Sequence, residues 1–176
     1  MHPVMPLAAP GSAAMPVSAM QAMLADIALA AQAPLAGRPR AVAGALARHL
    51  ADPTLLAGRD CPCAPESYTR HLLHADPAGA YAVVALVWRP GQITRIHDHI
   101  TWCTFGVIQG VEHEELFDAD LNLVGRSANH VGDVSGFAPP GDIHRVHNIG
   151  SETAISIHVY GTDMTRIGSS ARRYYD

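Results

Sequence analysis

The hydrophobic pattern changes character along the chain, and from Tyr68 onward short apolar-rich runs alternate with turn signals. The runs are SYTRHLLH, AYAVVALVW, ITRIHDH, WCTFGVIQG, EHEELF, NLVGRS, DVSGF, HRVHNI and TAISIHVY. The segments between them, such as DPAG, RPGQ and PPGD, are rich in residues that favour turns. Many short strands at close spacing predict an all-β sandwich or barrel. Residues 82–88 are apolar at every position, as expected for a strand buried on both faces.

Residues 18–58 show helical periodicity instead. Ser18 followed by Gln21 has the form of a capping box, and it precedes apolar residues at helical spacing. These are Met20, Met23, Leu24 and Ile27. A second helix is expected from about Pro39. Its apolar face carries Val42, Leu46 and Leu50. Asp52-Pro53 predicts the start of a short third helix that Gly58 ends.

These patterns divide the chain into three parts. Residues 1–17 are rich in Pro, Ala, Gly and Ser without periodicity, which predicts a disordered tail. Residues 18–60 are expected to form short N-terminal helices packed on the β core. Residues 61–176 are expected to form the β core, closed by a C-terminal tail packed against it. A length of 176 residues is consistent with one domain that buries a sizeable core.

Composition and charge exclude several classes of protein. Apolar residues make up 48% and charged residues 16%, and the formal net charge is −4 without any basic stripe, so no nucleic-acid partner is expected. No stretch resembles a membrane-spanning helix, and the N-terminal segment lacks the basic residues of a signal peptide. Three cysteines are too few for a disulfide framework, which favours a cytoplasmic location. The sequence leaves the choice between a monomer and a homodimer open.

Two histidines stand two residues apart in the segment RIHDHITWC. His97 and His99 share one face of a strand, whereas Asp98 points to the other face. Two imidazoles on one face can hold one metal ion. Isolated pairs of this kind are also common where no metal is bound. The pair therefore indicates a metal site only together with other residues.

The surroundings of this pair resemble the first motif of the cupin family, because Gly91 precedes it and Gly110 follows it at the expected spacing. Downstream, the segment GDVSGFAPPGDIHRVHN is similar to the second cupin motif. The resemblance implies a jelly-roll β-barrel and supplies a third metal ligand, His144. His147 is an alternative, although it lies three residues further and would face the other way on a strand.

A cysteine, Cys103, occupies the position where most cupins carry a glutamate. Together with YTR at residues 68–70 and SIHVY at residues 156–160, this substitution makes the chain similar to the thiol dioxygenases. That resemblance implies an Fe(II) site that adds both atoms of O2 to the sulfur of a small carboxylated thiol. It also implies a thioether between Cys103 and Tyr160, although the spacer after the two histidines is one residue shorter here.

Two further groups of residues suit this chemistry. Ser156, His158 and Tyr160 alternate, so they share one face of a strand and can form a hydrogen-bond relay. A guanidinium can bind a carboxylate through two hydrogen bonds. In the cysteine dioxygenases the residue that matches Arg70 does so, and Tyr68 would support it.

The resemblance favours oxidation of L-cysteine to cysteine sulfinate. Three alternatives stay open: a 3-mercaptopropionate dioxygenase, a different metallo-cupin enzyme such as an isomerase or a dioxygenase for non-thiol substrates, and a non-catalytic cupin that binds or senses a metal. Relatives that act on 3-mercaptopropionate carry their arginine further along the chain, where Arg166 is available here.

Overall fold

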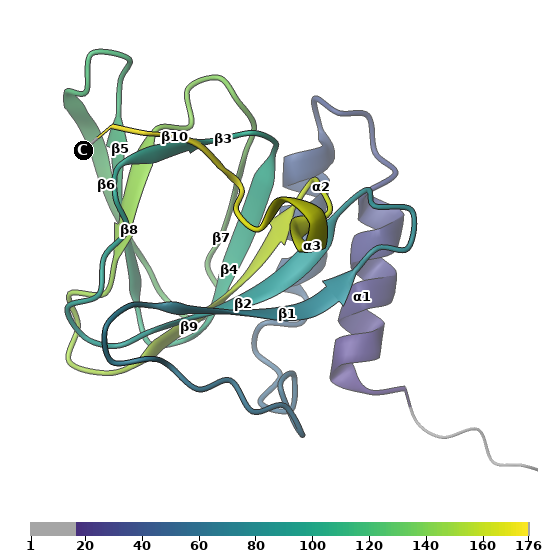
Figure 1. The fold of residues 1–176 in the computed structure, drawn as a ribbon. Helices are drawn as coiled ribbons and strands as arrows, with labels where there is room; N and C mark the ends of the chain where they lie inside the picture. The colour runs from purple at the N-terminus through teal and green to yellow at the C-terminus, as the bar shows by residue number, and fades with distance from the viewer. Residues whose placement is uncertain (1–16, 176) are drawn as a thin grey trace, which may run out of the picture.

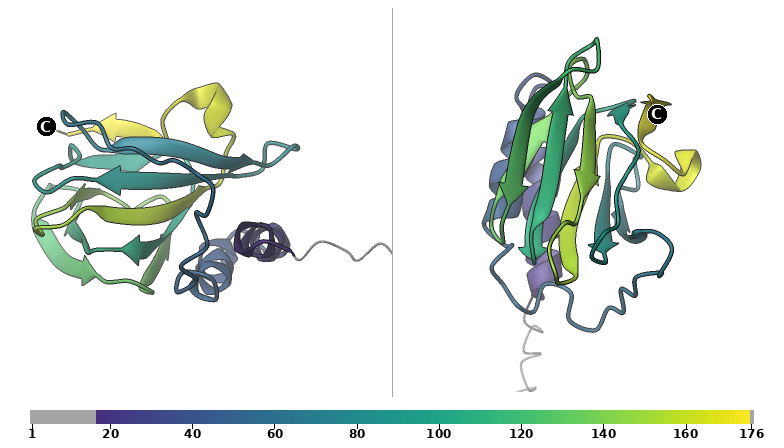
Figure 2. Two further views of the ribbon diagram at one scale, coloured as in Figure 1. Left: turned by 90° about the horizontal axis from the view of Figure 1, so that it is seen from below. Right: turned by 90° about the vertical axis from the view of Figure 1, so that its left-hand side faces the viewer.

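The protein is a sandwich of two antiparallel sheets in the computed structural model, which describes residues 17–175. The order in the first sheet is β1 (Thr69–Ala75), β2 (Ala82–Trp88), β9 (Ala154–Tyr160), β4 (Cys103–Gln109) and β7 (Val134–Phe137). The order in the second is β10 (Ala171–Tyr174), β3 (His97–His99), β8 (His144–His147), β5 (Glu112–Phe117) and β6 (Leu123–Asn129). The sheets face each other, with the two N-terminal helices outside the first one (Figures 1 and 2).

This arrangement confirms the expected all-β, cupin-like jelly roll. One detail differs from the prediction, because the described strands form two open sheets and not one hydrogen-bonded barrel. Strands β1 and β7 end the first sheet, and β10 and β6 end the second. The two sheets are held together by the side chains of their inner faces and by the chain connections. The tail predicted for residues 1–17 lies, apart from its last residue, outside the described part of the chain.

Strand β2 is buried on both faces, as its apolar sequence predicts. Val83 and Ala85 point outward into a cluster shared with the helices, whereas Val84 and Leu86 point into the space between the sheets. The same alternation holds in β9, where Ile157 and Val159 pack under the helices. The even-numbered residues of β9 therefore face the interior, which is where the candidate site lies.

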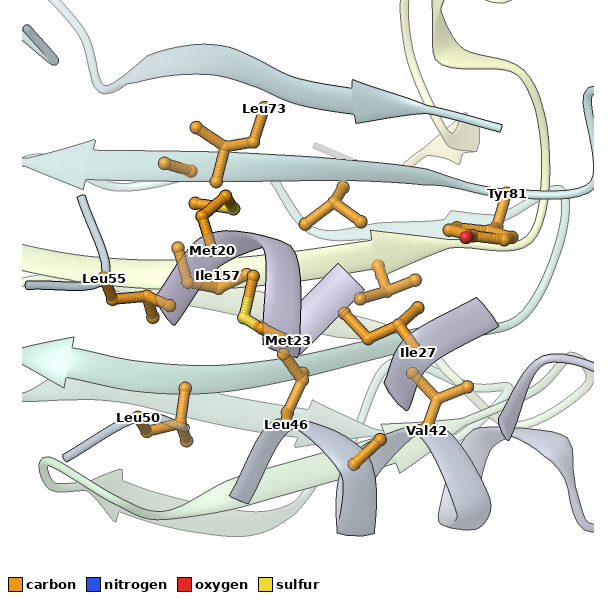
Figure 3. Packing of buried hydrophobic residues seen from close by; sticks show 14 of the residues in the cluster. Met20, Met23, Ile27, Val42, Leu46, Leu50, Leu55, Leu73, Tyr81 and Ile157 are labelled. Atoms are coloured by element: carbon orange, nitrogen blue, oxygen red, sulfur yellow. The ribbon is translucent and has the colours of Figure 1, made fainter. Parts of the chain in front are cut away.

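Helices α1 (Ala19–Ala30) and α2 (Arg38–Ala47) cover the outer face of the first sheet. The capping box of Ser18 and Gln21 is confirmed, with Ser18 Oγ accepting from the Gln21 amide at 3.1 Å. Met23 and Leu46 are fully buried in the layer between helices and sheet (Figure 3). This layer stabilises the sheet without contributing to the interior that holds the site.

Two glycines allow α2 to lie close to the sheet. A Cβ on Gly106 of β4 would stand 2.5 Å from Leu50 Cδ1, and one on Gly136 of β7 would stand 2.8 Å from the Pro39 carbonyl oxygen. Between them, Thr104 Oγ1 donates to the same carbonyl at 3.0 Å. A side chain at Gly136 would push α2 away from the sheet, whereas one at Gly106 would meet the flexible end of Leu50, which follows the helix.

The prediction of a third helix from Asp52 to Gly58 is wrong. The segment from Asp52 to Gly58 forms consecutive turns, because Asp52 Oδ1 accepts from the Thr54 amide at 2.8 Å and the backbone bonds span three residues instead of four. A short helix, α3 (Met164–Ile167), and strand β10 follow β9 in the segment that was expected only as a packed tail. Among the described residues, no helix combines the length and apolarity needed to cross a membrane.

Candidate active site

The three histidines singled out by the sequence meet between the sheets. His97 and His99 come from β3, and His144 of β8 stands directly opposite His97 in the antiparallel register. Their candidate ligand atoms all lie within 4.8 Å of one another, and their ring centroids are 4.7–5.0 Å apart. Within residues 17–175, this is the group of His, Cys, Asp and Glu side chains that could hold a metal ion.

The far side of each ring is hydrogen-bonded to an acceptor. His97 Nδ1 donates to the Arg95 carbonyl oxygen at 2.9 Å. His99 Nδ1 lies 3.1 Å from Asp142 Oδ2, and His144 Nδ1 lies 2.6 Å from Glu114 Oε1. Because carbonyl and ionised carboxylate oxygens accept, Nδ1 of His97 and of His99 carries the proton, and Nδ1 of His144 carries it when Glu114, whose pKa burial raises to about 7, is ionised. Each Nε2 is therefore left with a free lone pair, which is the state that binds a metal.

Burial keeps two of these rings, those of His97 and His144, neutral. Burial, together with the neighbouring His144, lowers the pKa of His97 to about 3. Burial and the neighbouring His99 lower the pKa of His144 to about 3. At neutral pH both imidazoles are therefore uncharged.

The donor set fits a metal ion. His144 Nε2 is buried without a hydrogen-bond partner among the described residues, a costly state that coordination would relieve. Three imidazole ligands suit Fe, Zn, Cu and Ni, and the described group contains no carboxylate.

The two competing residues face elsewhere. His147 stands opposite His113 on the outer side of β8, with the two ring centroids 5.7 Å apart. Asp98 is buried against the C-terminal strand, where Oδ2 accepts from Arg172 Nη2 at 2.5 Å and Arg173 Nη2 at 2.7 Å. This ion cluster fastens β10 to β3, beside the candidate metal ligands.

The three histidines open into a cavity of about 440 Å³ between the sheets. Tyr160 and His158 of β9 line it together with Tyr68 and the exposed Arg70 of β1. Tyr68 stacks on Trp88 of β2, with ring centroids 4.3 Å apart, which holds its ring against the wall. Within the described part of the chain, no Asp or Glu lines this cavity.

The two other arginines near the site differ in position. Arg95 lines the cavity on the side of β3, with its guanidinium 4.8 Å from the centre of the Tyr174 ring. Arg166, the alternative arginine from the sequence, is exposed on α3 and is not among the described residues that line the cavity. Arg70 is therefore the sequence-predicted arginine that the fold brings to the histidines.

The predicted relay is present as a line of hydrogen bonds along β9. Ser156 Oγ lies 2.9 Å from His158 Nε2, and the Tyr160 hydroxyl lies 3.3 Å from His158 Nδ1. Phe105 of β4 stacks on the His158 ring at 5.3 Å and fixes its plane. Burial, with a smaller contribution from Cys103, raises the pKa of Tyr160 well above its ordinary value, so its hydroxyl stays protonated at neutral pH.

Cys103 and Ser156 lie behind the cavity wall and are not among its described lining residues. Cys103 stands directly opposite Tyr160 in the register of β4 and β9, and its Sγ lies 3.9 Å from His158 Nδ1. Burial raises the pKa of the Cys103 thiol, which therefore stays protonated at neutral pH. The cross-strand position is compatible with the thioether implied by the resemblance, which stays a prediction.

Sequence reasoning missed the acidic residues behind the histidines and the relay. Glu112 and Glu114 alternate on β5, so a strand assignment alone would have placed both on one face. Asp142 precedes His144 by two residues in the turn that leads into β8. What the sequence could not show is that β5 lies beside β8, and that the face carrying Glu112 and Glu114 is the inner one.

Several solved structures share parts of this architecture. A protein from Thermus thermophilus has 16% sequence identity and a TM-score of 0.49, over 58% of this chain and 90% of the other. A Klebsiella pneumoniae protein described as having a double-stranded β-helix domain has 21% identity and a TM-score of 0.47, over 58% and 83%. An oxalate decarboxylase from Lactobacillus farciminis has 20% identity and a TM-score of 0.48, over 58% and 31%. At TM-scores below 0.5, these likenesses support no functional inference.

A family model gives a more specific result. The model described as cysteine dioxygenase type I matches residues 60–173, a range that runs from before β1 to the next-to-last residue of β10 and leaves out α1 and α2. The matched range contains the three histidines, the Ser-His-Tyr line and Arg70. The chain therefore belongs to the cysteine dioxygenase type I family.

Proposed function

We propose that the protein is an Fe(II)-dependent thiol dioxygenase that oxidises L-cysteine to cysteine sulfinate. The observation that carries this proposal is the donor set. Three imidazoles, with no described carboxylate among them, face a cavity that also contains Arg70 and Tyr160. A site of this kind leaves the positive charge of the ion uncompensated, which favours an anionic thiolate and leaves positions open.

Bound iron would supply the positions at which the substrate sulfur and O2 come together. The remaining work belongs to side chains of this chain. Arg70 is suited to bind the substrate carboxylate through its two-pronged guanidinium. Tyr68 and Trp88 form the wall beside it and limit how the substrate can turn. Tyr160 lines the cavity with a protonated hydroxyl whose neighbour in the relay is His158 Nδ1 at 3.3 Å, so it can take part in proton transfer with the reacting groups.

The choice of cysteine rests on the position of the arginine. Arg70 lines the cavity, as expected from relatives that act on cysteine, whereas Arg166 stands exposed on α3. A 3-mercaptopropionate dioxygenase and a non-catalytic metal-binding or metal-sensing cupin are the alternatives, and the same experiment separates them.

That experiment is oxygen uptake by the iron-loaded protein, followed by mass analysis of the product. We expect uptake with L-cysteine and a product heavier than cysteine by two oxygen atoms. A higher kcat/KM with 3-mercaptopropionate than with L-cysteine would assign 3-mercaptopropionate as the substrate. No uptake with either thiol, despite bound iron, would leave the non-catalytic alternative.

The Arg70→Ala variant tests how the substrate is held. We expect KM for cysteine to rise about 10- to 100-fold, because a charged hydrogen-bonded pair is worth roughly 1.5–3 kcal/mol. KM for cysteamine, which lacks the carboxylate, should change little. Steady-state oxygen uptake with both thiols measures the difference.

Arg59→Ala is the matched control, since it removes the same charge from an exposed residue outside this cavity. Equal rises of KM for cysteine and cysteamine in Arg70→Ala would remove Arg70 from substrate binding. A rise for cysteine in Arg166→Ala, without one in Arg70→Ala, would assign the carboxylate to the other arginine.

A further inference from the structure

A buried carboxylate lies at the far end of the relay, and the proposed reaction assigns it no role. Glu112 of β5 is 1% exposed and comes from the sheet opposite β9. Its Oε2 accepts a hydrogen bond from Ser156 Oγ and lies 3.7 Å from His158 Nε2. The line therefore runs across the sandwich, from Glu112 through Ser156 and His158 to the Tyr160 hydroxyl.

This carboxylate fixes the direction of the hydrogen bonds. A carboxylate can only accept, so the single hydroxyl proton of Ser156 is directed at Glu112. Toward His158 Nε2, 2.9 Å away, the serine oxygen can then only accept, which places a proton on Nε2. In the neutral ring the other nitrogen, Nδ1, keeps its lone pair.

The lone pair faces the cavity side of the relay. His158 Nδ1 has the Tyr160 hydroxyl at 3.3 Å and Cys103 Sγ at 3.9 Å. Both of these groups stay protonated at neutral pH and can donate to it. With the opposite tautomer, Nδ1 would carry a proton, and the tyrosine hydroxyl would be left with its own proton free to point elsewhere.

We infer that Glu112 is a positioning residue that sets the tautomer of His158 and thereby makes Nδ1 the acceptor for the Tyr160 hydroxyl proton. The role of that acceptor in thiol oxidation rests on the proposed function, whereas the tautomer itself does not. Glu112 Oε1 is buried without a hydrogen-bond partner among the described residues, a cost that a side chain with only a packing role would not carry.

Nuclear magnetic resonance of the histidine ring nitrogens tests this inference directly. The full-length chain is labelled with ¹⁵N in its histidines and studied both metal-free and loaded with diamagnetic Zn(II). The signal of His158 among the 11 histidines is identified by its loss in a His158→Gln variant. We expect a neutral ring with a protonated Nε2 and a bare Nδ1. A proton on Nδ1, with or without one on Nε2, would overturn the inference.

The Glu112→Gln variant replaces a side chain that accepts the Ser156 proton with one of similar shape that can also donate a hydrogen bond. Its amide can donate to Ser156, so the serine hydroxyl can turn toward His158 Nε2, and we expect the tautomer with a proton on Nδ1 to appear. Glu115→Gln is the matched control, because Glu115 lies on the same strand but pairs with Arg126 and Arg145 on the outer face. An unchanged His158 tautomer in Glu112→Gln would contradict the assigned role.

The kinetic readout separates this inference from the proposed function. In Glu112→Gln we expect iron content and KM for the thiol to stay the same, while kcat falls about tenfold or more, as for other residues that orient a reacting group. Wild-type protein that binds iron without consuming oxygen would refute the proposed function and leave the tautomer measurement to decide the inference. An unchanged kcat in a Glu112→Gln protein whose tautomer has shifted would refute the link to catalysis.

Discussion

The His144→Ala variant is expected to lose its bound iron and all thiol-dependent oxygen uptake. His144 is the candidate ligand that comes from β8, whereas the other two histidines come from β3. Loss of a residue that only hydrogen-bonds a ligand typically weakens metal binding about 10- to 100-fold, and loss of a ligand should cost more. Iron per chain after anaerobic loading and gel filtration measures the effect.

A thermal shift gives a second measure on the same samples. Free metal at about 100 times its Kd stabilises a folded protein by about 2.7 kcal/mol, so Fe(II) should raise the Tm of the wild type but not of His144→Ala. His147→Ala, on the outer face of the same strand, is the control and should keep both iron and thermal shift. The opposite pattern, with iron retained in His144→Ala and lost in His147→Ala, would assign the third ligand to His147.

The Tyr160→Phe variant is expected to keep its iron but to lose about 100-fold or more in kcat. Proton transfer by a positioned side chain contributes typically about 10²- to 10⁴-fold to a rate. The Tyr160 hydroxyl is buried, protonated and aligned by His158 at 3.3 Å, so it has the geometry for this task. KM for cysteine should change only a few-fold, because the carboxylate partner is on another strand.

Tyr81→Phe is the matched control for that variant. Tyr81 is also buried, but it belongs to the cluster under the helices and does not line the described cavity. It should leave kcat unchanged. A Tyr160→Phe enzyme with wild-type kcat would remove the hydroxyl from the reaction and leave the relay without a catalytic purpose.

Alternation along the strands made most of the fold predictable. The all-apolar run of β2 predicts a strand buried on both faces, and the alternating polar and apolar residues of β9 indicate which of its side chains face the interior. The capping box of Ser18 and Gln21 likewise marked the start of α1. The helix predicted after Asp52 is absent because the hydrogen bond from the Thr54 amide to the Asp52 side chain, which suits the start of a helix, also stabilises a turn.

The acidic residues behind the site could not be predicted in the same way. Glu112, Glu114 and Asp142 acquire their roles from the sheet order, which places β5 beside β8 and opposite β9. Local periodicity gives the face that a residue shares with its neighbours in the chain, but it does not give the strand that stands next to it. The candidate metal ligands were easier to predict because two of them lie on one strand.

The most direct test of the account is the coordination of iron in the loaded protein, determined by crystallography of Fe(II)-loaded crystals grown without oxygen. We expect one iron bound through Nε2 of His97, His99 and His144, with no protein carboxylate among its ligands and with open positions facing the cavity that contains Arg70. A carboxylate side chain bound to the metal, or iron held by any other set of residues, would contradict it.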